Sequence, residues 1–314
     1  MTDSRILVRG VMVLGVLTAA SFAACAGSTE SALHGEHQTL VHDGIERSYL
    51  VRVPPDSIQT REVLPLVLVL HGGGGNAEVT ERMTGFTEKA AREGFIVVYP
   101  EGTSRFTGKL LTWNAGHCCG YAMEHQVDDV GFISALLDKL IQEYRVDSAR
   151  IYVTGMSNGG MLTHRLGIQL SDRFAAIAPV VATLFGDETP PALPVSAIMI
   201  NGLLDQAVPT QGGPPGGRFL TAWDGTPAKP ALSQGIFWAG SNDCGTTPVS
   251  DDRGTYVLWR YLCPEGRAVE LYLVKDSGHA WPGGEKGGRR GDQPGSSLNG
   301  TDVIWTFFKN YPRQ

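Results

Sequence analysis

Charged residues are scarce in this chain of 314 residues, at 18% of the total, and positive charge is not in excess. Lysine and arginine number 26 against 32 aspartates and glutamates, which gives a net charge of −6 with neutral histidines. Binding to nucleic acid needs clustered basic residues, so this balance argues against a nucleic-acid partner. The apolar stretch at residues 6–20 is shorter than the roughly 20 residues of a membrane-spanning helix.

Cysteine is also rare, and its spacing excludes the common metal sites. The five cysteines form no C-x-x-C pair and the eight histidines do not cluster at ligand spacing, so we predict no metal site and no cofactor. Cys244 and Cys263 flank a predicted strand at residues 255–262, and we expect them to form a disulfide in an oxidising compartment. The adjacent Cys118 and Cys119 could form a disulfide with each other or remain thiols.

The first 24 residues have the pattern of a secretory signal peptide. Arg5 and Arg9 give a basic start, an apolar stretch follows, and small residues end it. Residues 21–25, Ser-Phe-Ala-Ala-Cys, resemble a bacterial lipobox, in which Cys25 would carry the lipid and residues 25–36 would be a tether. Phe22 replaces the aliphatic residue usual there, so release and lipid anchoring to a membrane are both open. The expected location is extracellular or periplasmic.

Residues 37–314 have the pattern of one α/β domain. Short apolar runs at residues 63–70, 95–100, 149–154, 195–201 and 268–274 predict buried strands. Residues 37–53 predict a hairpin, and residues 84–93, 130–144 and 304–308 predict helices, with Asp128 and Asp129 at a helix start. We therefore expect a mostly parallel central sheet with an antiparallel N-terminal edge and helices on both faces.

One pentapeptide, Gly155-Met156-Ser157-Asn158-Gly159, lies where a predicted strand gives way to a predicted helix. This is the setting of a nucleophile elbow, a sharp turn that exposes the serine oxygen while the two glycines let strand and helix pass closely. With 40 glycines in the chain, the pentapeptide alone is weak evidence. Ser157 is the candidate nucleophile if partners for it occur in the right order.

A glycine-rich segment follows the strand at residues 63–70. His71 and the four glycines after it could bring backbone N–H groups close to a substrate carbonyl. We expect donors near Gly73 and at Asn158 to form an oxyanion hole. The alternative is an ordinary flexible turn.

Two further strand ends supply the other partners. Asp205 follows the predicted strand at residues 195–201, and His279 lies in the loop after residues 268–274. Asp276 is a rival acid, but a residue three positions before the base rarely reaches its Nδ1 face, so we favour Asp205. The order Ser157, Asp205, His279 is that of the α/β-hydrolase fold.

The substrate site is less well marked. Residues 212–230 and 282–297 are long and rich in glycine and proline, and the second directly follows His279, so we expect it to border a substrate cleft. Aromatic residues are candidates for lining that cleft, with core packing as their alternative: His71, Trp113, Tyr121 and Trp281. We expect His117 and His164 to be structural or surface residues.

These segments together resemble the polyhydroxybutyrate-depolymerase-like esterases, a family that also contains secreted feruloyl and acetylxylan esterases. The resemblance spans nearly all of the chain after the signal peptide, through the following segments: His71-Gly72, residues 113–120, residues 127–132, the elbow, residues 205–209, residues 278–283 and the aromatic end at 305–308. It implies the same three residues as nucleophile, acid and base. Asn201 departs from the family pattern, because a histidine is usual there, and this affects local loop packing.

The resemblance implies a secreted carboxylic ester hydrolase for hydroxyalkanoate oligomers or polyesters. The alternative is a feruloyl or acetylxylan esterase for plant cell-wall esters. A serine peptidase with the same triad and a non-catalytic cell-surface binding protein are rivals of other classes. The expected partner is a small or oligomeric ester, and no obligate protein partner is implied.

Overall fold

The computed structural model describes residues 1–2, 35–54, 62–106, 108–216, 222–289 and 291–314. Internal contacts divide the chain into two units, Met1–Glu30 and Ser31–Gln314, and the fold below is that of the second. The predicted signal peptide, Cys25 and most of the predicted tether lie outside the described residues. Within the described ranges, no helix has both the length and the apolar character to span a membrane.

A ten-stranded sheet forms the centre of Ser31–Gln314, in the order β1-β2-β4-β3-β5-β6-β7-β10-β9-β8. Its six central strands are parallel, and five of them correspond to the predicted apolar runs, whereas β6 was not predicted. The six strands are β4 (Ile96–Pro100), β3 (Leu64–Leu70), β5 (Val146–Met156), β6 (Ala176–Val180), β7 (Ser196–Gly202) and β10 (Val269–Val274). All residues of β3, β4, β6 and β7 are buried, which is why the predicted runs at β3, β4 and β7 are almost continuously apolar.

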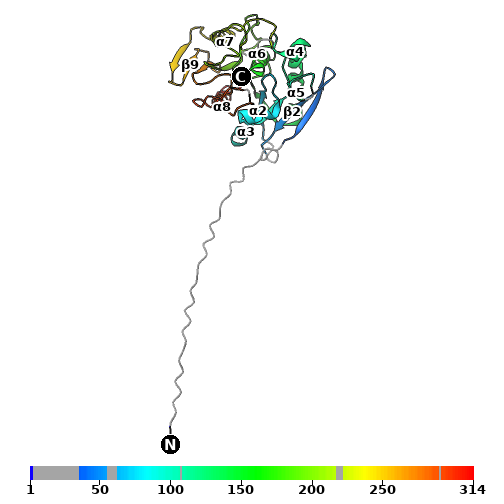
Figure 1. The fold of residues 1–314 in the computed structure, drawn as a ribbon, viewed down its shortest axis with the longest axis vertical. Coiled ribbons are helices and arrows are strands. Elements are labelled where there is room, and N and C mark those ends of the chain that lie inside the picture. The colour runs from blue at the N-terminus through cyan, green and yellow to red at the C-terminus, as the bar shows by residue number, and fades with distance from the viewer. Residues whose placement is uncertain (3–34, 55–61, 107, 217–221, 290) are drawn as a thin grey trace. The chain divides into compact units, whose positions relative to one another are not determined.

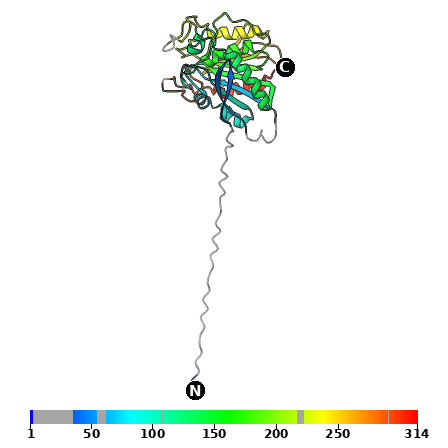
Figure 2. The same ribbon diagram turned by 90° about the vertical axis from the view of Figure 1, so that its right-hand side faces the viewer.

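Both edges of the sheet are antiparallel. The predicted N-terminal hairpin is confirmed as β1 (His37–His42) and β2 (Ile45–Arg52), and β2 also pairs antiparallel with β4. These blue strands lie together at one side in Figure 1 and face the viewer in Figure 2. At the other edge, β9 (Tyr256–Arg260) pairs antiparallel with β10 and with β8 (Val249–Asp252). The sequence analysis does not predict β8, because its four residues are mostly polar and exposed.

Helices cover both faces of the sheet (Figure 1). Side chains of α5 (Asp129–Glu143), α6 (Asn158–Gln169) and α7 (Ala231–Ser241) belong to one apolar core. Side chains of α2 (Ala77–Thr84), α3 (Phe86–Glu93) and α8 (Gly300–Asn310) belong to a second core on the other face. A short helix, α4 (Gly120–Glu124), lies in a connection.

The predicted helix at residues 84–93 begins two residues late in the structure, and a separate helix precedes it. Gly85 ends α2 in the left-handed region, with φ of 65°, and the chain restarts as α3. Asn76 begins α2, because its side chain accepts a hydrogen bond from the N–H of Val79. This places the start of α2 directly after the glycines that follow β3.

The expected disulfide joins Cys244 and Cys263 with an S–S distance of 2.08 Å. It ties the segment after α7 to the segment after β9. Cys118 and Cys119 are also bonded to each other. The two bonds together use every cysteine among the described residues.

Candidate active site

Three polar side chains meet where three parallel strands end. Ser157 follows β5, Asp205 lies shortly after β7, and His279 lies in the loop after β10. The Nδ1 atom of His279 is 2.8 Å from Oδ2 of Asp205, and its Nε2 atom is 2.8 Å from Oγ of Ser157. Because β5, β7 and β10 are parallel members of one sheet, their carboxyl ends open at the same edge, where ligands of open α/β sheets bind.

The turn at Ser157 has the geometry of a nucleophile elbow. Its φ is 58° and its ψ is −122°, a conformation that a non-glycine residue adopts only under strain. A Cβ built on Gly155 would lie 2.6 Å from the carbonyl oxygen of Gly159, and one built on Gly159 would lie 2.4 Å from that of His71. Only glycine fits at positions 155 and 159, two residues before and two residues after the serine. This explains the spacing of the pentapeptide.

Asp205 is held with its carboxylate aimed at His279. Its Oδ1 accepts hydrogen bonds from the N–H groups of Ala207 and Val208, each 2.8 Å long, and its side chain is fully buried. The rival acid, Asp276, points elsewhere and accepts hydrogen bonds from Ser296 and Ser297. Of the two aspartates considered from the sequence, the structure brings Asp205 to the histidine.

The backbone of His279 has a partner that sequence reasoning missed. Oδ2 of Asp292 accepts a hydrogen bond of 2.8 Å from the N–H of His279. A Cβ on Gly278, the residue before His279, would lie 2.5 Å from the same oxygen of Asp292. The glycine therefore lets the carboxylate approach. Asp292 lies in the irregular stretch of residues 282–297, where spacing gives no signal for a particular side chain.

The glycine-rich segment after β3 lies against the elbow. A Cβ on Gly72 would lie 3.5 Å from that of Ser157, and one on Gly73 would lie 3.7 Å from that of Asn158. The loop is shaped by backbone hydrogen bonds from Gly74 to Leu111 and from Gly75 to Gly72. The segment is therefore an ordered part of the site.

His71 and Trp113 do not line the cleft, contrary to our expectation. Both are fully buried and stack on each other with ring centroids 4.7 Å apart. His71 donates from Nδ1 to the carbonyl of Gly72 and accepts at Nε2 from the N–H of Gly102, while Trp113 donates from Nε1 to the carbonyl of His71. Burial lowers the pKa of His71 to about 4, so its ring is neutral and supports the loop from behind.

Two cavities flank Ser157. The first, of about 260 Å³, lies under the loop after His279 and is lined by Gly72–Gly75, Thr80, Trp281, Glu285 and Asp292, among others. Its lining confirms that the stretch at residues 282–297 borders the cleft. Trp281 is one of the lining residues, although it is only 1% exposed and its Nε1 donates to Thr301.

The second cavity, of about 210 Å³, is the more apolar one. Leu110, Val208 and Trp223 line it together with Ser157, Asn158 and His279. The sequence analysis missed Leu110 and Trp223, because both lie in connections without regular periodicity. Tyr121, a candidate in the sequence, lines a different cavity beside Arg47 and Phe106.

Among the described residues, no group of three or more His, Cys, Asp or Glu side chains is arranged to hold a metal ion. His164 is buried between Gln234 and Trp238, and burial lowers its pKa to about 4. Asn201 is also buried and donates to the carbonyl of Ala182.

The sheet topology, the elbow and the convergence of the three strand ends define a protein of the α/β-hydrolase fold. Residues 47–209, about half of the chain, match the family model described as "Esterase PHB depolymerase". The chain belongs to this family.

Similar proteins carry esterase names. "Putative esterase NocK" of Nocardia uniformis subsp. tsuyamanensis is 31% identical over 255 residues, which are 77% of this chain and 72% of that protein. "Feruloyl esterase B" of Piromyces equi is 28% identical over 240 residues, 74% of this chain but only 42% of that protein. The structure of an acetyl xylan esterase from Aspergillus awamori superposes with a TM-score of 0.59 at 15% identity, covering 88% of this chain and 100% of that one, and shows the same fold.

Proposed function

We propose that this chain is a serine carboxylic ester hydrolase that works through an acyl-enzyme. His279 takes the proton of Ser157 as the serine oxygen attacks the ester carbonyl, and Asp205 holds the imidazole in the required tautomer. The N–H groups of Gly73 and Asn158 stabilise the negative oxygen of the tetrahedral intermediate. His279 then protonates the leaving alcohol, and water activated by the same histidine releases the acid.

The observation that carries this proposal is the continuous chain of two hydrogen bonds, each 2.8 Å long, from Asp205 through His279 to Ser157. A strained serine at the tip of an elbow is the second support, because that conformation has no structural benefit of its own. A non-catalytic binding protein would need neither feature.

We propose hydroxyalkanoate oligomers as the first substrate class, on the basis of the family. Such an ester has an apolar chain on both sides of the carbonyl. The apolar cavity lined by Leu110, Val208 and Trp223 suits one side, and the open cavity lined by Thr80 and Glu285 receives the other.

Plant cell-wall esters are a second candidate, which the difference between the two cavities favours. A feruloyl or acetyl group would fill the apolar cavity, and a sugar alcohol would meet Thr80, Glu285 and Asp292 in the more polar one. The names of two relatives, feruloyl esterase B and acetylxylan esterase, support this reading.

One comparative assay tests both candidates. Hydroxybutyrate oligomers, methyl ferulate and acetylated xylan are offered side by side to the wild-type chain and to Ser157→Ala. We expect ester turnover by the wild type and its loss by at least about 10³-fold in the variant. Equal turnover by the variant would overturn the serine mechanism.

We propose that the protein is exported, since the disulfide between Cys244 and Cys263 is typical of an oxidising compartment. Lipid attachment at Cys25 is tested by labelling cells with a radioactive fatty acid. Incorporation that is lost in Cys25→Ala would support an anchored protein. Incorporation that persists in this variant, or none at all, would contradict lipid attachment at Cys25.

A further inference from the structure

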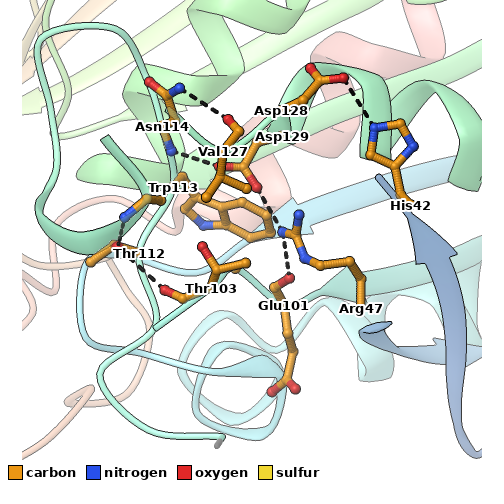
Figure 3. A network of polar contacts seen from close by, with 12 residues as sticks. His42, Arg47, Glu101, Thr103, Thr112, Trp113, Asn114, Val127, Asp128 and Asp129 are labelled. Carbon is orange, nitrogen blue, oxygen red and sulfur yellow. Dashed lines mark hydrogen bonds and ion pairs between the residues drawn. The ribbon is translucent and has the colours of Figure 1, made fainter. Parts of the chain in front are cut away.

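A buried ion pair lies behind the oxyanion region, outside the three residues of the proposed triad (Figure 3). Nη2 of Arg47, on β2, is 2.7 Å from Oδ1 of Asp129 at the start of α5, and it also donates to the carbonyl of Glu101. The two side chains are 2% and 0% exposed. The guanidinium lies 4.0 Å from the ring centroid of Phe132.

This pair is an expensive way to stabilise a fold. Removing two charges from water costs several kcal/mol per ion, and replacing such a pair by apolar residues is often neutral or stabilising. Burial lowers the pKa of Arg47 and raises that of Asp129, although each partner opposes the shift of the other. Nε of Arg47 is buried without a hydrogen-bond partner, so the desolvation of the guanidinium is not fully offset.

The second carboxylate oxygen of Asp129 holds the backbone of the neighbouring loop. Its Oδ2 accepts a hydrogen bond of 2.7 Å from the N–H of Asn114. The side chain of Asn114 donates to the carbonyl of Val127. The backbone carbonyl of Asn114 accepts a hydrogen bond from Nη1 of Arg165. Figure 3 shows Asn114 and Arg47 reaching Asp129 from different directions. The ion pair thus holds the N–H of the Trp113–Asn114 peptide through Asp129.

Trp113 in turn touches both halves of the proposed oxyanion hole. Its N–H donates to Oδ1 of Asn158 at 2.7 Å, and its carbonyl accepts from Nδ2 of Asn158 at 2.9 Å. Its indole N–H donates to the carbonyl of His71, the residue before Gly72. A displacement of the Trp113 backbone would therefore move Asn158 and the glycine loop together.

We propose that Arg47 and Asp129 are positioning residues for the oxyanion hole, acting through Asn114 and Trp113 on Asn158 and on the loop at Gly73. The pair touches no substrate, and the inference rests on the proposed serine mechanism. An interaction that matters only for the tetrahedral intermediate changes kcat and leaves KM nearly unchanged.

The neighbouring Asp128 offers a matched control. It lies at the same helix start, accepts from the N–H of Gly131 and pairs with His42 at 3.0 Å. Figure 3 places this pair to one side of Arg47, and its hydrogen bonds do not include the Trp113–Asn114 peptide. Asparagine is as good a helix cap as aspartate, so Asp128→Asn removes the same charge without removing the cap.

The experiment compares Asp129→Asn, Arg47→Lys and the double variant Arg47→Met/Asp129→Leu with Asp128→Asn and the wild type. Reactive sites are counted with a fluorophosphonate carried to completion, so that kcat refers to folded enzyme. Turnover of p-nitrophenyl acetate gives kcat and KM, its pH profile reports the apparent pKa of the proposed base, and a boronic acid serves as a tetrahedral mimic.

In the three variants of the pair we expect kcat per reactive site to fall by roughly 10- to 100-fold, less than the 10²–10³ for removing an oxyanion donor outright. In these variants KM and the apparent pKa of the proposed base should stay near the wild-type values, and the boronic acid should bind more weakly by a factor similar to the loss in kcat. The control Asp128→Asn should behave as the wild type in every measurement. Wild-type kcat per reactive site in the pair variants, even with less folded protein, would overturn the proposal. If the wild type itself turned over no ester, or Ser157→Ala kept full activity, the proposed function would fail instead.

Discussion

Two aspartates compete in the sequence for one role, and the structure assigns them different surroundings. Asp205 is buried and bonded to the imidazole of His279, while Asp276 is bonded to Ser296 and Ser297 in a neighbouring loop. An acid that orients the catalytic base must meet its Nδ1–H, and distance along the chain does not decide this.

Exchange of each aspartate for asparagine separates the two roles. We expect Asp205→Asn to lower kcat by about 10⁴-fold, because the amide holds the wrong imidazole tautomer. Asp276→Asn should stay within about two-fold of the wild type, since it changes only a loop contact. Steady-state ester hydrolysis measures both effects. Comparable losses in the two variants would contradict the assignment.

At the level of single residues, the sequence predicts what chain order and strand ends determine. Ser157, Asp205 and His279 each follow an apolar run, so their meeting could be inferred from the parallel sheet. Asp292, Leu110 and Trp223 could not be inferred, because irregular loops place them and no period marks them. The aromatic side chains of His71 and Trp113 suggested a substrate surface. In the structure both are buried and form hydrogen bonds with the protein backbone.

One irregular segment near the site is fastened by a histidine. His117 lies 2.7 Å from a carboxylate oxygen of Asp224 and 2.8 Å from one of Asp187. The N–H of Asp224 donates to the carbonyl of His117, and the adjacent Trp223 lines the apolar cavity. Burial lowers the pKa of His117, but the hydrogen bonds with the two carboxylates outweigh it and raise the pKa above the usual value.

This clasp, formed by His117, Asp187 and Asp224, should respond to pH. The pKa of His117 is raised in the folded protein, so protonated His117 stabilises the clasp fully below about pH 6.5. This stabilisation is lost as the pH rises through the folded-state pKa. The hydrogen bond from His117 lowers the pKa of Asp187. At acidic pH the clasp therefore persists until the pH falls below the usual pKa range of an aspartate. Both carboxylates are well exposed, so the effect should stay below about 1 kcal/mol.

The measurement is KM for a bulky aryl ester against pH, together with amide hydrogen exchange at residues 222–226. We expect KM to rise a few-fold at alkaline pH in the wild type and to be high at every pH in His117→Ala. A pH dependence of KM that is the same in both proteins would count against the clasp.

Among the elements, five of the six parallel strands and several helices could be predicted, because their sequence pattern reflects burial on one or two faces. The helices α2 and α7 and the strand β6 were not predicted. The helix at residues 130–144 and the N-terminal hairpin occur within one or two residues of their predicted bounds. The break at Gly85 and the strand β8 were missed, because a glycine within a periodic run and a short polar edge strand give no pattern.

The molecule as a whole rests on two apolar cores separated by the sheet. In the second core, Phe308 of α8 stacks on Tyr152 of β5 with ring centroids 4.7 Å apart and planes within 6°. This contact ties the C-terminal helix to the strand that carries the elbow. The sequence predicts buried strands with helices on both faces, but not which helix packs on which face.

Removal of this ring should weaken the whole fold. Phe308 is fully buried, so Phe308→Ala should lower the free energy of unfolding by about 3–5 kcal/mol, measured by urea denaturation. Phe106, which is 51% exposed, provides the control, and Phe106→Ala should cost less than about 0.5 kcal/mol. Similar losses in the two variants would contradict the packing described for the second core.

The exposure of Leu110 has an evolutionary consequence. This side chain lines the apolar cavity beside Ser157, yet it is 61% exposed and belongs to neither core. If the apolar cavity receives the acyl group as proposed, exchanges at this position would alter which acyl groups are accepted while leaving the fold intact. A lineage could therefore adapt to new esters by substitutions at Leu110. The glycines around the elbow cannot be replaced in this way, because a Cβ there would clash with the backbone.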